Sequence, residues 1–96
     1  METLTDEQID ERLGTAGLTA WSHAGPTLVR DHQVGDFPAA IALVNAVAAA
    51  AEELDHHPDI LVHGWNKVRL TLSTHSVGGL TEADFALAGR IEALLR

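Results

Sequence analysis

The stretch VRLTLSTH, residues 68–75, decides the fold, because its alternation is that of a half-buried β-strand. One side of this strand carries the apolar residues and a threonine: Val68, Leu70, Leu72 and Thr74. The other side carries polar residues: Arg69, Thr71, Ser73 and His75. We therefore predict a strand over 68–75 that has one face on a core and ends with His75 on its polar face.

Helix signals lie on both sides of this strand. After the turn Gly78-Gly79, Thr81 and Asp84 resemble a capping box and start a helix. Its apolar face is expected to carry Phe85, Ala88, Ile91 and Leu95. Upstream, Asp36 caps a helix over 37–54, which cannot continue through Pro58. The spacing predicts that this helix buries one stripe: Phe37, Ile41, Val44, Ala48 and Ala51.

The remaining segments alternate in the same way. Thr5 caps a first helix that ends at Gly14 and Gly17. Short strands are predicted over 18–22 and 27–33 around a Gly25-Pro26 turn, and over 60–62 before a bulge or bend at Gly64. The order α-β-β-α-β-β-α predicts an α+β fold with a mostly antiparallel sheet and helices on one side.

Composition limits the classes of function. Ninety-six residues, 46% of them hydrophobic and 21% charged, fit one globular domain over 1–96. A net charge of −8 disfavours direct contact with nucleic acid or with an anionic membrane surface. The apolar stretch 37–51 is shorter than a bilayer span and is expected to be a core helix. The chain has no cysteine, which fits the cytoplasmic location that we expect.

Chemistry is concentrated where the second helix ends. His56 and His57 are adjacent there, and His75 ends the strand. Imidazoles suit proton transfer near neutral pH, and Glu52 and Asp55 are placed to orient or charge them. A zinc site built from the three histidines is the weaker alternative, because neighbouring ligands seldom face one ion. Of the other histidines, His23 and His32 are expected to be solvated and His63 structural.

A composite signature resembles the pterin-4a-carbinolamine dehydratases. It consists of four pieces: Ala51-Glu52-Glu53-Leu54-Asp55-His56-His57-Pro58-Asp59, Trp65-Asn66-Lys67-Val68, Thr71-Leu72-Ser73-Thr74-His75, and Gly79-Leu80-Thr81 with Asp84. The strong resemblance covers 51–91, about half of the chain. The sequence departs from the family's pattern in having Asp55 where asparagine is usual and Trp65 where the animal members have tyrosine. It also has one extra residue near His63-Gly64.

The resemblance implies a four-stranded antiparallel sheet with three helices packed on one face. It implies dehydration of 4a-hydroxytetrahydropterin to quinonoid dihydropterin, without a metal or cofactor. His57 corresponds to the residue associated with substrate binding and base function, and His56 and His75 to those that assist departure of the hydroxyl. The substrate-binding set that we expect is Glu52, Asp55, Pro58, Trp21 and Asp84.

The resemblance also implies a homodimer or homotetramer, with no nucleic-acid or membrane partner. Two alternatives remain open on the sequence. One is a non-catalytic dimerisation or binding module, with the helix over 37–54 as its surface. The other is a pterin-handling role without turnover. A pure binder has no need for all three histidines, so their presence favours the enzyme.

Overall fold

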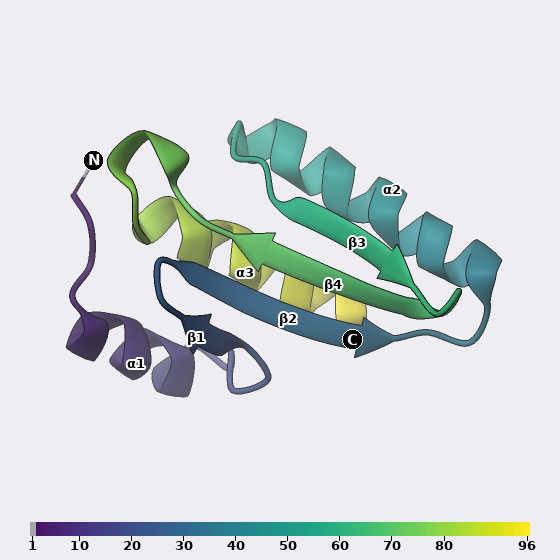
Figure 1. Ribbon diagram of the computed structural model, residues 1–96, viewed down its shortest axis with the longest axis horizontal. Coiled ribbons are helices and arrows are strands. Elements are labelled where there is room, and N and C mark those ends of the chain that lie inside the picture. Colours follow the sequence, from purple (N-terminus) through teal and green to yellow (C-terminus); the bar gives the residue numbers. More distant parts are fainter. Residues whose placement is uncertain (1) are drawn as a thin grey trace.

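A computed structural model describes residues 2–96 and follows the predicted order of elements. The elements are α1 (Asp6–Thr15), β1 (Ser22–Ala24), β2 (Thr27–Gln33), α2 (Phe37–Leu54), β3 (Asp59–His63), β4 (Lys67–Leu72), the short 3-10 helix η1 (His75–Val77) and α3 (Glu82–Leu95). The strands form one antiparallel sheet in the order β1-β2-β4-β3. Figure 1 shows α2 and α3 behind this sheet and α1 beside β1. The predicted α+β fold is confirmed.

The inward face of β4 is the centre of the core. Val68, Leu70 and Leu72 are fully buried, and Leu87 and Ile91 of α3 belong to the same apolar cluster. The predicted alternation is therefore confirmed. The predicted length is not, because β4 ends at Leu72 and not at His75. The chain turns there: Thr74 makes an isolated bridge with Gly79, and His75 begins η1.

The buried face of α2 differs in part from the predicted stripe. The residues that face the core are Ala40, Val47, Ala50 and Ala51, of which the stripe included Ala51 alone. Phe37 is 51% exposed and Ile41 is 39% exposed. At about 100° per residue, the true face is rotated by roughly a quarter turn from the predicted one. The reason is close packing, since small alanine side chains let α2 approach α3 and leave the bulky side chains outside.

Because this exposed face is apolar, α2 resembles a membrane-spanning helix in its composition. The helix spans 18 residues with a mean hydropathy of 1.4, so its length and composition are within the range of a membrane span. Its buried residues nevertheless lie against the sheet and α3, as in a core helix. The helix has the predicted bounds, and the apolar stretch 37–51, which was expected to be part of a core helix, lies within its 18 residues.

The first hairpin starts later than predicted. β1 covers Ser22–Ala24 rather than 18–22, and Ala24 pairs with Thr27 across the Gly25-Pro26 turn. Pairing in a tight hairpin begins next to its turn, so the strand has to occupy the residues adjoining Gly25. Leu18 and Trp21 are buried all the same, and they reach the core from a turn segment instead of a strand.

The hairpin between β3 and β4 contains a strained tryptophan. Gly64 has φ +53° and Trp65 has φ +57°, and the Trp65 side chain is exposed, with 61% of the residue's surface accessible. The left-handed region is unfavourable for a bulky side chain, by roughly 1–2 kcal/mol. The bend predicted at Gly64 is therefore present. Its second left-handed residue is Trp65, at a position where glycine would be favourable.

We expect Trp65→Gly to raise the free energy of unfolding by about 1 kcal/mol, because glycine adopts this backbone without steric cost. Chemical denaturation followed by circular dichroism measures the change. Trp65→Ala is the matched control, since it also removes the indole but keeps a Cβ. An equal gain in both variants would mean that the indole, and not the backbone, is the source of strain.

Candidate active site

The end of α2 fixes the position of the paired histidines. Asp55 adopts a left-handed conformation, with φ 48° and ψ 45°. Its N–H donates to the Glu52 carbonyl at 3.3 Å, and the N–H of His56 donates to the Ala51 carbonyl at 3.0 Å. These are the two bonds of a Schellman ending, which satisfies the last helical carbonyls and reverses the chain. The reversal directs His56 inward, toward α3.

His56 is bound to a buried carboxylate. Its Nε2 lies 2.6 Å from Oδ1 of Asp84, and the side chains are 14% and 0% exposed. A carboxylate accepts hydrogen bonds, so Nε2 carries the hydrogen. This arrangement leaves Nδ1 as the ring atom that is free to contact another partner. When the imidazole is protonated, the contact is an ion pair.

The other oxygen of Asp84 is held by two threonines. Thr74 Oγ1 donates to Asp84 Oδ2 at 2.7 Å, and the Thr81 N–H donates to the same oxygen at 2.9 Å. The hydroxyls of Thr74 and Thr81 are 2.8 Å apart. Thr74 has one hydrogen, which goes to Asp84, so the Thr81 hydroxyl donates to Thr74. We call these four residues, His56, Asp84, Thr74 and Thr81, the buried relay.

His57 takes the opposite direction. Its side chain is 60% exposed, and its Nε2 lies 2.5 Å from a carboxylate oxygen of Glu52. Pro58 follows directly and restricts the backbone of His57 to extended conformations. The adjacent imidazoles therefore have different environments: one is fixed in the protein interior and one is open to solvent. Such an exposed pair contributes little to stability, but it orients the ring.

His75 is joined to the relay through the chain. It is exposed and is the first residue of η1, directly after Thr74. Since Thr74 bonds to Asp84, which in turn bonds to His56, the backbone at His75 is fixed relative to His56. The structure thus includes one of the three predicted histidines, His56, in the network, and it places His57 and His75 next to members of the network in the chain.

Two members of the predicted substrate-binding set are buried instead of open. Asp84 is fully buried in the relay, and Trp21 is 4% exposed. The Trp21 indole N–H donates to Glu92 at 2.8 Å, and Glu92 also accepts from Arg30 at 2.6 Å. Glu92 is two helical turns beyond Asp84 on α3. Direct contact with a ligand, expected for both, is replaced by internal hydrogen bonds. Glu52 and Asp55 are exposed, and Pro58 is half-buried.

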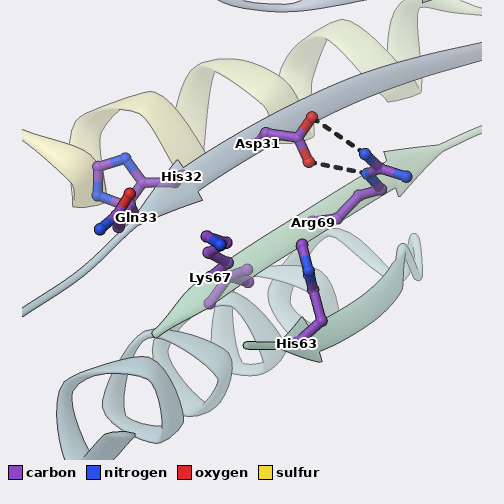
Figure 2. Close-up of a pocket in the computed structure, with 7 residues that line it drawn as sticks. Asp31, His32, Gln33, His63, Lys67 and Arg69 are labelled. Atoms are coloured by element: carbon purple, nitrogen blue, oxygen red, sulfur yellow. Dashed lines mark hydrogen bonds and ion pairs between the residues drawn. The ribbon is translucent and has the colours of Figure 1, made fainter. Parts of the chain in front are cut away.

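The hollows of the surface do not coincide with the histidines. One of about 350 Å³ lies on the open face of the sheet (Figure 2), and its lining includes none of the predicted site residues. Another of about 310 Å³ lies beside α2 and the end of α3. Within residues 2–96, no three His, Asp or Glu side chains form a group able to hold a metal ion.

The sequence analysis missed the roles of Thr74 and Thr81. Both signals were present: Thr74 is the one polar residue on the inward side of the strand pattern, and Thr81 belongs to the capping box with Asp84. A threonine on a buried face needs a hydrogen-bond partner, and the capping carboxylate of Asp84 provides it.

Comparison with known proteins relates the chain to a protein family. The model of the family described as "Pterin 4 alpha carbinolamine dehydratase" matches residues 2–94. A protein of Acidobacterium capsulatum is 52% identical over 95 residues, which cover 99% of this chain and 100% of the relative. A protein of Nocardia farcinica is 50% identical over 95 residues, covering 99% and 97%. Both are named as pterin-4-alpha-carbinolamine dehydratases, and both names assign the activity provisionally.

Two solved structures are similar. One is the crystal structure of a transcriptional coactivator/pterin dehydratase from Brucella melitensis, with a TM-score of 0.89 and 33% identity over 97% of this chain and 98% of that one. The other is a pterin dehydratase-like protein described as a RuBisCO assembly factor in the alpha-carboxysome. It has a TM-score of 0.63 and 32% identity over 77% of this chain and 84% of that one.

Proposed function

Because the chain belongs to the pterin 4 alpha carbinolamine dehydratase family, we propose that it removes water from 4a-hydroxytetrahydropterin to give quinonoid dihydropterin. The C4a–O bond breaks, the hydroxyl takes up a proton and leaves as water, and N5 loses its proton as the C4a=N5 double bond forms. The role is recycling of a pterin cofactor in the cytoplasm. The reaction consists of proton transfers and one bond cleavage, so the proposal requires no metal or cofactor.

The observation that carries the proposal is the buried bond from His56 to Asp84, next to an exposed His57. Elimination of water needs a proton donor on the oxygen and an acceptor for the N5 proton. The hydrogen bond to the buried Asp84 fixes the orientation of the His56 imidazole, and we assign the donor role to this ring. We assign the acceptor role to His57, and we assign to His75 assistance to the leaving hydroxyl.

The exposed members of the predicted binding set fit a surface that meets the substrate. Glu52 holds the His57 ring, while Asp55 and Pro58 shape the backbone on either side of the two histidines. We propose that these residues contact the substrate. Asp84 does not contact it and instead orients the His56 ring through their hydrogen bond. Trp21 is then a support of the core and not a stacking surface, in agreement with its burial.

The test is the decay of freshly made 4a-hydroxytetrahydropterin, followed by absorbance with and without the protein. We expect the protein to accelerate the decay over buffer alone. A decay rate equal to that in buffer would contradict the enzyme and would favour the non-catalytic alternative. The description of one structural relative as a RuBisCO assembly factor is the observation that keeps a binding role as the alternative.

We further propose a homodimer or homotetramer in which the exposed side of α2 meets a second copy. This side carries Phe37 and Ile41, with Ala48 on the same stripe and Leu54 at 37% exposure. Such an apolar stripe, eighteen residues long, is typical of an interface and unusual on a monomer.

Ile41→Glu is expected to lower the measured molar mass to that of the monomer, because it places a charge in the apolar stripe. Analytical ultracentrifugation gives the molar mass. Ala86→Glu is the matched control, because it adds the same charge to an exposed helical position on α3. An unchanged molar mass in both variants would show that α2 is not the interface.

A further inference from the structure

The open face of the sheet carries a hollow at the end of β4 that is remote from Thr74. It has a volume of about 350 Å³ and is lined by residues of β2, β3 and β4. Gln33 and His63 are the cross-strand partners of Lys67, on either side of it. Directly opposite residues on one face have Cβ atoms about 4.5–5.5 Å apart, so these three side chains form one row. Figure 2 shows Lys67 between His63 and Gln33.

Lys67 carries a positive charge that no carboxylate in this hollow neutralises. It is the one lysine of a chain with 14 carboxylate side chains. Arg12, Arg30, Arg69 and Arg90 each pair with a carboxylate. Among residues 2–96, no carboxylate lies within 4 Å of the Lys67 ammonium group. Among the described residues, Lys67 and the terminal Arg96 are the two side-chain cations that form no such ion pair, and of these Lys67 lines a hollow.

The one carboxylate that lines the hollow is already neutralised. Asp31 accepts hydrogen bonds from Nε and Nη2 of Arg69 at 2.8 and 3.3 Å, as the dashed lines of Figure 2 show. The hydrogen bonds from Arg69 hold the pKa of Asp31 below its usual value of 3.8, so the pair stays charged near neutral pH. Arg69 and Asp31 cancel, and the charge of Lys67 remains.

Two neighbours of Lys67 on the open face carry further hydrogen-bond donors. The Gln33 amide and the His63 ring belong to residues that line the hollow and pair with Lys67 across the sheet. The ammonium group lies near Gly64, where an added Cβ would be 3.4 Å from Lys67 Nζ. The amine therefore lies close over the turn, and a larger residue at 64 would crowd it.

We propose that this hollow binds a phosphate group, either as free phosphate or as a small phosphate ester. A tetrahedral oxyanion presents several acceptor oxygens, which match one ammonium group, one amide and one imidazole. A cation is disfavoured, because the one carboxylate present is committed to Arg69. The volume exceeds that of the phosphate group alone and leaves room for an organic substituent.

This site is separate from the buried relay. Lys67 begins β4, whereas Thr74 lies beyond its other end, so the length of the strand separates them (Figure 1). The proposal therefore does not depend on the dehydratase. The net charge of −8 also opposes general attraction of anions, so any binding has to come from local contacts.

The experiment is an NMR titration of the full chain, at constant ionic strength, with inorganic phosphate, with phenyl phosphate and with chloride as the reference. We expect saturable amide shifts at Gln33, His63 and Lys67 with both phosphates and none with chloride. Tighter binding of phenyl phosphate would identify the ester as the preferred form, and equal binding would identify the free ion. Lys67→Gln should weaken binding by about tenfold or more, as loss of a charge-assisted hydrogen bond does.

Arg12→Gln is the matched control, because it removes the same charge from α1 and should leave the affinity unchanged. Absence of saturable shifts with both phosphates would overturn the proposal. Equal weakening by Arg12→Gln and Lys67→Gln would also overturn it, since that would indicate a general charge effect. Dehydratase activity should be the same in Lys67→Gln and the wild type, which separates this test from that of the proposed function.

Discussion

His57→Ala is expected to reduce the acceleration of 4a-hydroxytetrahydropterin decay by about 10²–10⁴-fold, the usual contribution of one general acid or base. The imidazole of His57 is exposed and contacts the exposed Glu52, so its loss removes little packing. We therefore expect the melting temperature to stay close to that of the wild type. Activity is measured by absorbance and stability by thermal denaturation on the same preparations.

The matched control is His63→Ala, which removes another exposed imidazole. His63 is the last residue of β3, at the end of the strand that is remote from His57. It should leave the rate of decay unchanged. If both variants lose activity equally, a general effect of histidine removal is responsible. If His57→Ala keeps the full rate while the wild type accelerates the decay, the assignment of His57 as the base is wrong and His75 becomes the next residue to test.

Asp84→Ala is expected to lower the free energy of unfolding by about 3–5 kcal/mol, because it leaves a buried imidazole and two threonines without their acceptor. In a domain of this size each kcal/mol corresponds to roughly 4–8 °C in melting temperature. The variant should therefore be much less stable than any variant of the exposed histidines. Denaturation by urea, followed by circular dichroism, measures the loss.

A double-mutant cycle with His56→Leu separates the contact from general damage to the core. If Asp84 acts through His56, the double variant should be more stable than the sum of the two single losses predicts. Thr74→Val provides the milder variant, since it removes the two hydrogen bonds of the Thr74 hydroxyl, leaves the His56–Asp84 contact in place and keeps the volume. A loss below about 1 kcal/mol in Asp84→Ala would show that the relay does not stabilise the fold.

Elements with a local signal could be predicted from the sequence. β2 and α2 have the predicted bounds. For α2 this is because Asp36 caps the start of the helix and Pro58 prevents its continuation. The capping box from Thr81 to Asp84 is also confirmed. The errors come from tertiary structure. The face that α2 buries depends on how closely α3 approaches, which no periodicity within α2 records.

The same division applies to the candidate site. The histidines are recognisable from the residue types at the end of a helix and the end of a strand. The burial of Trp21 and Asp84 could not be predicted, since each depends on partners far along the chain: Glu92 for Trp21, and His56 for Asp84. A local pattern identifies which groups carry the chemistry, but the packing of α3 decides which of them can meet a ligand.

The positions of the two tryptophans give the molecule a pair of optical reporters. The chain has no tyrosine, so its ultraviolet fluorescence comes from Trp21 and Trp65, apart from the weak signal of two phenylalanines. Trp21 is enclosed in the core, whereas Trp65 stands in water at the tip of the β3–β4 hairpin. Acrylamide should quench Trp65 while the chain is folded and reach Trp21 only when the core opens. The emission of one wild-type sample can therefore distinguish an event at the hairpin tip from unfolding, without an attached dye.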